Sequence, residues 1–464
     1  MAEVTFLGAC GTVTGSATQL RWSDTSVLVD CGLFQGSDEV ERRNWEAFPF
    51  DAHTLDAVIL THAHLDHTGR LPRLVRLGFD GPIYCSRASR GLVSLILQDS
   101  GHLQEEQARY ARKKGYSRHA DPQPLYTAAD ARATLRKLSP VVFDEWHEVA
   151  PGITFRYRRA GHLLGAASIE IKAKGADGKR RTWLFSGDVG RYDAPLLKDP
   201  QPPGEEPAAL VLESTYGDRD RAESDPEAAF RETIPRVFAR GGTVVIPAFA
   251  LGRTQEVLYH LSALVEDGVL EPDDVFLDSP MAIKATDLYR HAKSEHDREL
   301  AELVERQASG LGPDRFQRCR SVEQSKALNR RRKPAVIVAS SGMATGGRVV
   351  HHLKRLLPDR DNAVVFVGYQ AEGTRGRALL NGARSVGIHG EAIPARAEIL
   401  SLHGLSAHAD RDELLRWCDA LPAAPDRVFL NHGEDPARKA LAATLAQKGL
   451  PRPALPLSGE AHPW

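Results

Sequence analysis

Four potential metal ligands lie within six residues of this chain, directly after the apolar residues 57–60. They are His62, His64, Asp66 and His67. A strand that ended at residue 60 would place them on a tight loop, where the short spacing lets His62 and His64 bind one cation while the other two turn toward a second. Imidazole and carboxylate groups are ligands that zinc accepts. The spacing therefore predicts a two-metal site at a strand end, with a polar, histidine-rich turn as the alternative.

Three further residues could complete such a site. His162 lies on a glycine-flanked turn after an alternating segment, and Asp188 and His432 each follow an apolar run. All three settings have the pattern of a strand that runs into a turn. Because two metals need more ligands than one loop provides, we expect these residues to lie beside the first four.

In this order, the residues resemble the five motifs of the metallo-β-lactamase superfamily, the first of which contains Asp30. The resemblance implies one ligand set for each metal: His62, His64 and His162 for the first, and Asp66, His67 and His432 for the second. It also implies that Asp188 bridges both metals and that Asp30 lies behind the ligands, accepting a hydrogen bond that orients a histidine or its loop. We therefore expect two zinc ions per chain, with manganese or iron as alternatives.

The pattern of apolar residues changes near residue 209. A chain of 464 residues exceeds what one core usually supports, so more than one domain is expected. Before residue 209, short strands and turns alternate; after it, beginning with a strand at 209–212, continuous apolar strands alternate with helical segments, as in a parallel sheet. We expect an α/β protein in which residues 1–208 and 396–464 form the αββα sandwich of the superfamily and residues 209–395 form an inserted parallel-sheet domain.

An inserted α/β domain at this place resembles the β-CASP nucleases. Glu213, in Glu-Ser-Thr-Tyr-Gly, resembles their acidic motif, and His408, in Leu-Ser-Ala-His-Ala-Asp, resembles their histidine motif. His432 in His-Gly-Glu matches their last motif and favours RNA over DNA. Within the family, the chain is similar to bacterial ribonucleases that resemble the endonuclease subunit of the eukaryotic pre-mRNA 3′-processing complex.

The resemblance implies a metal-dependent ribonuclease that acts on single-stranded RNA. Two metals about 3.5 to 4 Å apart can activate a shared water as hydroxide and aim it at phosphorus, which predicts 5′-phosphate and 3′-hydroxyl ends. Asp66, His408 and Glu213 are the expected catalytic residues: His408 protonates the leaving 3′ oxygen or hydrogen-bonds the developing charge, and Glu213 orients its ring. The short segment after His432 favours endonucleolytic cleavage, with a homodimer as a candidate assembly.

Contacts to RNA are expected in the inserted domain. Ser340, Ser341 and Gly342 follow an apolar strand and precede a helical segment, so their N–H groups can hold a phosphate at the positive end of the helix dipole. Arg253, at a predicted helix start that faces the same end of the sheet, is a second candidate. A ligand-free turn of small residues is an equally compatible interpretation of residues 340–342.

A basic cluster precedes that strand. Against the single acid Glu323, residues 315–333 contain eight basic residues: Arg315, Arg318, Arg320, Lys326, Arg330, Arg331, Arg332 and Lys333. The cluster predicts either a surface that follows RNA or a solvated linker. The net charge of −1 argues against strong nonspecific binding over the whole surface.

Two other functions remain open at this stage. A hydrolase of a small ester, thioester or lactam would use the same metals but leaves Glu213 and His408 unexplained. A catalytically inactive scaffold subunit would not need competent residues at all seven ligand positions. The five cysteines have no paired spacing, which suits a reducing cytoplasm. Because no apolar run approaches the roughly 20 residues of a membrane span, no membrane association is expected.

Overall fold

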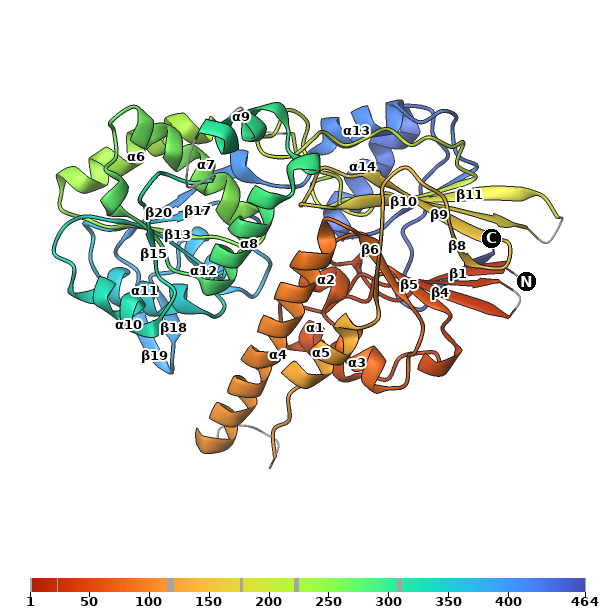
Figure 1. The fold of residues 1–464 in the computed structure, drawn as a ribbon, viewed down its shortest axis with the longest axis horizontal. Coiled ribbons are helices and arrows are strands. Elements are labelled where there is room, and N and C mark those ends of the chain that lie inside the picture. Colours follow the sequence, from red (N-terminus) through yellow and green to blue (C-terminus); the bar gives the residue numbers. More distant parts are fainter. Residues whose placement is uncertain are drawn as a thin grey trace. The chain divides into compact units, whose positions relative to one another are not determined.

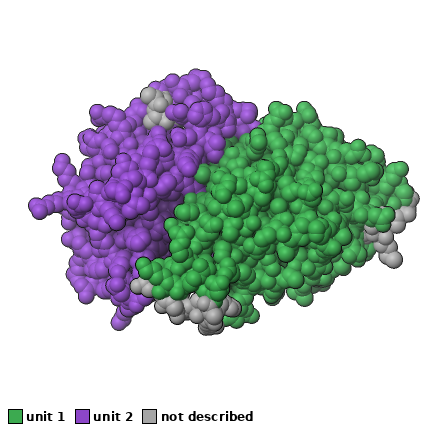
Figure 2. Space-filling model, turned by 60° about the horizontal axis from the view of Figure 1, so that its bottom comes forward, with its two compact units in different colours: residues 1–194, 198–220, 408–464 green, residues 195–197, 221–407 purple. Residues whose placement is uncertain are grey.

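The computed structural model describes residues 2–22, 24–114, 121–175, 178–220, 225–306 and 311–463. The chain divides into two compact units (Figure 2). Unit 1 contains Met1–Ala194, Lys198–Asp220 and His408–Trp464, and unit 2 contains Pro195–Leu197 and Arg221–Ala407.

Unit 1 is built around two sheets (Figure 1). The first has the strand order β23-β1-β3-β4-β5-β6-β7, with the bounds β1 (Ala2–Phe6), β3 (Thr18–Trp22), β4 (Thr25–Val29), β5 (Ala57–Ile59), β6 (Ile83–Ser86), β7 (Leu138–Val141) and β23 (Ala461–Pro463). The second has the order β21-β12-β11-β10-β9-β8, with the bounds β8 (His147–Ala150), β9 (Ile153–Arg159), β10 (Ala167–Lys174), β11 (Arg180–Phe185), β12 (Ala209–Leu212) and β21 (Arg427–Leu430). The short strands β2 (Cys10–Gly11) and β22 (Gly433–Glu434) pair with each other.

The core of unit 1 lies between these sheets. β9 alternates as the period of a strand requires, with Ile153, Phe155 and Tyr157 buried and less buried residues between them. These side chains pack in one cluster with Val4 and Ile59 of the first sheet.

Helices cover the outer faces of the two sheets, which gives the αββα arrangement expected from the sequence (Figure 1). Beside the first sheet lie α2 (Leu65–Thr68), α3 (Leu71–Arg76), α4 (Ser89–Lys114) and α5 (Ala128–Leu135), and the short α1 (Asp38–Arg42) lies in the loop after β4. α13 (Arg411–Asp419) and α14 (Asp435–Gln447) pack on β11, β12 and β21 of the second sheet through residues such as Trp417 and Leu441.

Unit 2 has a parallel sheet of strand order β15-β14-β16-β13-β17-β20. Its strands are β13 (Val244–Pro247), β14 (Val275–Leu277), β15 (Gln317–Arg318), β16 (Val336–Ala339), β17 (Ala363–Phe366) and β20 (Glu398–Ser401). The helices are α6 (Pro226–Ala239), α7 (Arg253–Glu266), α8 (Pro280–His291), α9 (Arg298–Arg306), α10 (Val322–Ala327), α11 (Arg348–Leu356) and α12 (Arg375–Leu380). α6, α7 and α8 cover one face, whereas α11, α12 and the hairpin of β18 (Ser385–Ile388) and β19 (Glu391–Pro394) cover the other.

Both expected boundaries of the insert, at residues 209 and 395, differ from the observed ones. β12, which we expected to open the insert, pairs with β11 and β21 in unit 1. Its four residues are all buried because it lies inside a sheet with a layer on each face, so a continuous apolar run fits either unit. At the other end, β20 pairs with β17, and unit 2 therefore extends to Ala407.

Asp278, directly after β14, connects several elements of unit 2. Its carboxylate is fully buried, accepts hydrogen bonds from Ser325 Oγ (2.6 Å) and Arg348 (2.7 Å), and lies 2.7 Å from His352 Nε2. Burial opposes ionisation, but the bonds from His352, Ser325 and Arg348 hold the pKa of Asp278 below its ordinary value. Asp278 thereby fixes the start of α11 against the end of β14.

We expect Asp278→Ala to destabilise the protein by about 3–5 kcal/mol, because Arg348 and His352 would lose a buried partner. Urea unfolding measures the change. The matched control is Asp274→Ala, which removes the half-buried partner of Arg331 and should lower the free energy of unfolding by less than about 1 kcal/mol. Equal losses in the two variants would contradict a special role for Asp278.

None of the helices in the described ranges is both long enough and apolar enough to span a membrane.

Candidate metal centre

Unit 1 brings together all seven residues that the sequence suggests as metal ligands: His62, His64, Asp66, His67, His162, Asp188 and His432. Each follows the end of a strand or lies in α2, directly behind β5. The topology of the sheets brings distant parts of the chain together here. His432 is 365 positions from His67, yet their Nε2 atoms are 3.1 Å apart.

The first ligand group consists of His62, His64, His162 and Asp188, whose donor atoms all lie within 4.8 Å of one another. His64 Nδ1 is 3.0 Å from His62 Nε2 and 3.2 Å from His162 Nε2. Asp188 Oδ2 is 3.5 Å from His62 Nε2 and 3.6 Å from His162 Nε2. Ligand atoms about 2.0–2.2 Å from a tetrahedral zinc ion are roughly 3.3–3.6 Å apart, so this geometry fits a metal ion.

The second group consists of Asp66, His67 and His432. His432 Nε2 lies 3.7 Å from Asp66 Oδ2, and Asp188 Oδ1 lies 3.4 Å from His67 Nε2. The two oxygens of Asp188 thus face different ligand groups. Asp188 Oδ1 is buried and has no hydrogen-bond partner among the described residues, which a bound cation would explain.

Protonation in the first group also suits a metal. Burial lowers the pKa of His62 well below its ordinary value and lowers that of His64 to about 4, so both rings are neutral and can donate a lone pair. Burial disfavours the charged form of Asp188, but His432, His67 and His62 hold its pKa well below the ordinary value.

His67 differs from these histidines. Burial lowers its pKa, but Asp188 and Asp30 outweigh burial and raise the pKa of His67 well above its ordinary value. Two carboxylates therefore attract a cation at this ring, and a metal would take the place of the proton.

Asp30 and Thr61 lie behind the ligands. Asp30 Oδ2 is 2.7 Å from His67 Nδ1, and Asp30 accepts hydrogen bonds from the backbone N–H of Thr61 (2.8 Å) and from Ser16 Oγ (3.2 Å). The Thr61 hydroxyl contacts Asp30 and lies 3.1 Å from Nδ1 of both His62 and His67. One hydroxyl and one carboxylate thus orient a histidine of each group. Neither Thr61 nor Ser16 was predicted from the sequence to support the ligands, although Thr61 directly precedes His62.

Thr215 was also missed. Its hydroxyl lies 3.2 Å from His432 Nδ1, on the opposite side of the ring from the Nε2 atom that faces Asp66. We expect Thr215→Val to weaken zinc binding by about 10- to 100-fold, the range found when an outer partner of a ligand histidine is lost. Competitive titration with a chromophoric chelator measures this affinity. Thr182→Val, which alters another buried threonine of unit 1, is the control, and equal affinities in the two variants would contradict the assignment.

His408 and Glu213 form a pair beside the ligand groups. His408 Nδ1 lies 3.2 Å from Glu213 Oε1, and its Nε2 lies 3.9 Å from Asp188 Oδ2. Glu213 is 2% exposed and also accepts hydrogen bonds from the backbone N–H groups of Val189 (2.7 Å) and Thr215 (3.2 Å). Burial lowers the pKa of His408, but Glu213 and Asp188 outweigh it and raise this pKa to about 8.

Asp188, Glu213 and His408 could also surround a cation, because their donor atoms lie close together. The backbone N–H groups of Val189 and Thr215 already occupy the Glu213 carboxylate. Glu213 is therefore better suited to orienting His408 than to binding a metal.

The suggested RNA contacts lie in unit 2. Ser340 follows β16, and its hydroxyl donates to Ser279 Oγ (3.0 Å). Ser341 Oγ accepts hydrogen bonds from the backbone N–H groups of Thr345 (3.1 Å) and Gly346 (3.3 Å), so these donors are used within the loop.

Gly342 is buried in the same loop. Arg253 begins α7 after β13, at the same end of the sheet because β13 and β16 are parallel neighbours. However, Arg253 is only 5% exposed and pairs with Glu256. A phosphate contact by Arg253 would have to displace that carboxylate.

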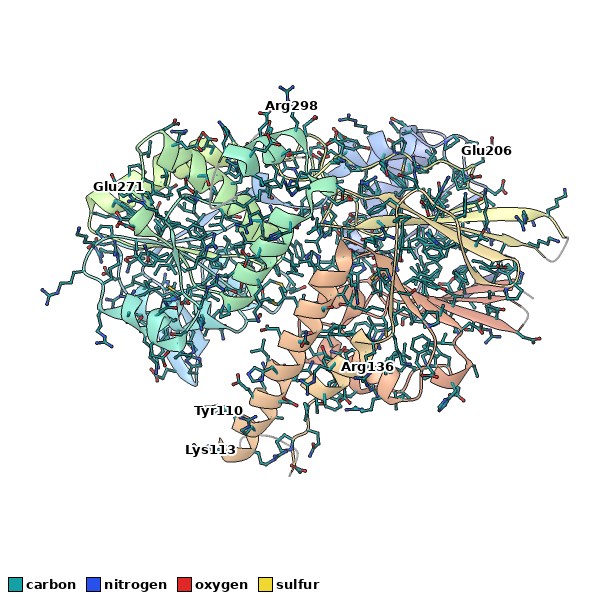
Figure 3. All side chains as sticks on the ribbon, in the orientation of Figure 1. Tyr110, Lys113, Arg136, Glu206, Glu271 and Arg298 are labelled. Carbon is teal, nitrogen blue, oxygen red and sulfur yellow. The ribbon has the colours of Figure 1, made fainter. Side chains whose placement is uncertain are left out.

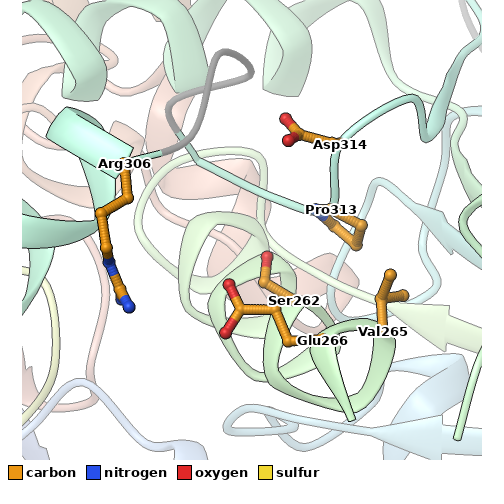
Figure 4. Close-up of a pocket in the computed structure, with 6 residues that line it drawn as sticks. All are labelled: Ser262, Val265, Glu266, Arg306, Pro313 and Asp314. Atoms are coloured by element: carbon orange, nitrogen blue, oxygen red, sulfur yellow. The ribbon is translucent and has the colours of Figure 1, made fainter. Parts of the chain in front are cut away.

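A separate pocket of about 340 Å³ lies in unit 2 (Figure 4). It is lined by Ser262, Val265, Glu266, Arg306, Pro313 and Asp314. None of these residues belongs to the ligand groups, so the candidate metal centre is defined by its donor atoms and not by this pocket.

Three family models match successive parts of the chain. Residues 13–230 match the metallo-beta-lactamase superfamily, residues 254–379 match the Beta-Casp domain, and residues 392–453 match the Zn-dependent metallo-hydrolase RNA specificity domain. His408 and His432 both lie in the third match.

The chain is similar to curated proteins over almost its whole length. Ribonuclease TTHA0252 of Thermus thermophilus is 39% identical over 445 residues, which cover 95% of each protein. Transcription termination factor FttA of Methanocaldococcus jannaschii is 32% identical over 445 residues, which cover 93% of this chain and 67% of FttA. A solved structure of a protein of unknown function from Enterococcus faecalis aligns with a TM-score of 0.53 at 14% identity over 99% of both chains, a likeness of fold alone.

Proposed function

We propose that this chain, which belongs to the β-CASP family of the metallo-β-lactamase superfamily, is a metal-dependent ribonuclease that leaves 5′-phosphate and 3′-hydroxyl ends. The observation that carries the proposal is the position of the His408–Glu213 pair beside two metal-ligand groups that share Asp188. The similarity to a protein named as a ribonuclease supports RNA as the substrate.

Two divalent cations, zinc in the first instance, would be held by the two ligand groups, with Asp188 between them. When bound, they would supply the Lewis acidity that activates water and offsets negative charge on the phosphoryl oxygens. Behind them, Asp30, Thr61 and Thr215 keep the ligand rings in one orientation, which preserves the site for each turnover.

His408 is the proposed general acid. Its Nδ1 faces Glu213, so Nε2 is the nitrogen that can deliver a proton to the leaving 3′ oxygen. Glu213 cannot turn away, because two backbone N–H groups hold its carboxylate. Hydrolysis by water does not require the 2′-hydroxyl, which accounts for the proposed product ends.

We further propose that the enzyme cleaves single-stranded RNA internally and acts in the cytoplasm. All five cysteines are unpaired, which suits a reducing compartment. A homodimer stays a prediction, and light scattering of the purified protein tests it.

Purified protein of measured metal content, incubated with end-labelled linear RNA, circular RNA and DNA of one sequence, tests this function. We expect cleavage of both RNAs, with 5′-phosphate ends. Cleavage of the circular RNA would identify an endonuclease, because a circle has no end for an exonuclease to attack. Cleavage of the linear RNA alone would show that the enzyme is an exonuclease. A metal-loaded protein that cleaves no RNA but hydrolyses a thioester would overturn the proposal, and a protein that binds no metal would favour a scaffold subunit.

A further inference from the structure

The basic cluster at residues 315–333 has two kinds of member in the structure. Arg331 pairs with Asp274, Arg318 lies 4.0 Å from Asp287, and Lys326 lies three residues after Glu323 in α10. The other members are exposed, and in the described part of the chain their side chains form no ion pair or hydrogen bond. We call them the basic stripe: Arg315, Arg320, Arg330, Arg332 and Lys333.

The two segments that carry the basic stripe are both fixed, by residues between its members, to one short element, the 3₁₀ helix η3 (Pro272–Asp274). Gln317, in the edge strand β15, donates to Asp273 Oδ1 at 3.1 Å. Arg331 pairs with the adjacent Asp274, and its guanidinium lies 4.9 Å from the centre of the Phe276 ring. Residues far apart along this segment are thus held on the same side of unit 2.

Arg331 also explains why its neighbours are exposed. Its side chain points inward to Asp274 and Phe276, so the chain is fixed there. Arg330, Arg332 and Lys333 on either side of it are exposed. A solvated linker would not need such an inward anchor in the middle of a basic run.

One member of the basic stripe contacts the start of α11, which follows the loop where the sequence suggests phosphate contacts. Arg348, which begins α11 after that loop, donates to the backbone oxygens of Cys319 (2.9 Å) and Arg320 (3.3 Å) as well as to Asp278. The backbone of Arg320, one member of the stripe, is therefore held beside Arg348, which directly follows the strand-to-helix turn at residues 340–347.

We propose that the basic stripe binds the sugar-phosphate backbone of single-stranded RNA outside the reaction site. The inference rests on the proposed ribonuclease function, and it gives unit 2 a part in holding long substrates. When unpaired arginine and lysine side chains neutralise phosphates, they release the counterions that are bound to the RNA, which favours binding. Arg331 already pairs with Asp274 and cannot contribute in this way. The whole chain has a net charge of −1, so its surface as a whole should attract RNA only weakly. We therefore expect phosphate binding mainly at this local excess of positive charge.

The alternative is that the charges only protect an edge strand. β15 is the edge of its sheet, and basic residues often prevent such edges from pairing with another chain. Arg330, Arg332 and Lys333 lie outside β15, so replacing these three tests RNA binding without changing the edge strand.

The test compares the full chain with its Arg330→Gln/Arg332→Gln/Lys333→Gln variant. Binding of a fluorescent single-stranded RNA is measured in chelator at several salt concentrations. The plot of log K against log salt has a negative slope, and each lost phosphate contact should make it less steep by about 0.7. For three lost contacts we expect the magnitude of the slope to decrease by about 2 and binding to be up to roughly 100-fold weaker at 0.1 M salt. With metal present, KM should rise for long RNA, while kcat and the cleavage of a short oligonucleotide stay unchanged.

The control variant is Arg109→Gln/Lys113→Gln/Arg136→Gln, which removes the same charge from exposed residues of α4 and the α5 C-cap in unit 1. Figure 3 shows Lys113 and Arg136 on these elements. Both variants should unfold at the same urea concentration as the parent.

An unchanged salt slope in the stripe variant, or the same change in both variants, would overturn the proposal. Stripe-dependent binding to anionic lipid vesicles with unchanged RNA binding would overturn it too. Binding is measured in chelator, so absence of RNA cleavage would refute the proposed function alone.

Discussion

Asp188→Ala is expected to abolish RNA cleavage and to lower the metal content of the protein. The two oxygens of Asp188 face different ligand groups, so its loss affects both groups at once. Metal activation of water lowers the activation free energy by several kcal/mol. Its loss should therefore slow cleavage by at least about 10³-fold. Rates on end-labelled RNA and metal analysis of the purified variant measure the two effects.

The outcome is informative only if the variant folds. The buried Asp188 carboxylate lies within 4 Å of five histidines, and its removal changes their interactions as well as the metal. Unfolding in chelator separates these effects, because a defect in metal binding alone leaves that transition unchanged. Asp419→Ala, which removes an exposed carboxylate paired with Lys448, is the control and should retain metal and activity. Full cleavage by Asp188→Ala would refute the bridging role.

The ligands could be predicted because each has a local signal. A short apolar run followed by a turn marks a strand end, and His62, His162 and Asp188 all lie at such ends. Their convergence could not be derived from spacing. It depends on β21 lying parallel to β12, a pairing between segments more than 200 residues apart that brings His432 to His67.

The residues that support the ligands lack a signal of this kind. Thr61 and Thr215 are threonines near motif residues, and their role is visible only when their hydroxyls are found 3.1–3.2 Å from ring nitrogens. The boundary at residue 209 was wrong for a related reason. Burial on both faces produces the same apolar run in β12 of unit 1 as in the strands of unit 2.

Arg253 shows the limit of position as a guide to function. Arg253 begins α7, directly after the turn that follows β13. It lies at the same end of the sheet as Ser340, as the sequence predicts. The sequence also contains Glu256 three residues later, the spacing at which helical side chains meet. That pairing holds the guanidinium in a buried position, whereas Arg330 and Arg332 have no such partner among the residues that the structure describes.

His408→Ala is expected to slow RNA cleavage by about 10²- to 10⁴-fold, the range for loss of a general acid, while the protein keeps its metal. Metal retention follows from the geometry, because His408 lies outside both ligand groups and faces Glu213. His102→Ala, which alters a histidine whose side chain is 60% exposed, is the control and should cleave normally.

A substrate with sulfur in place of the leaving 3′ oxygen isolates the proton transfer. A thiol has a pKa of about 8.5 and leaves without a proton, so His408→Ala should cleave this RNA about as fast as the parent does. Glu213→Gln keeps the shape of the side chain but weakens its hold on His408 Nδ1, and the same substrate should restore its activity. If His408→Ala is equally slow on both substrates, the ring stabilises charge on the phosphoryl group and another residue protonates the leaving oxygen.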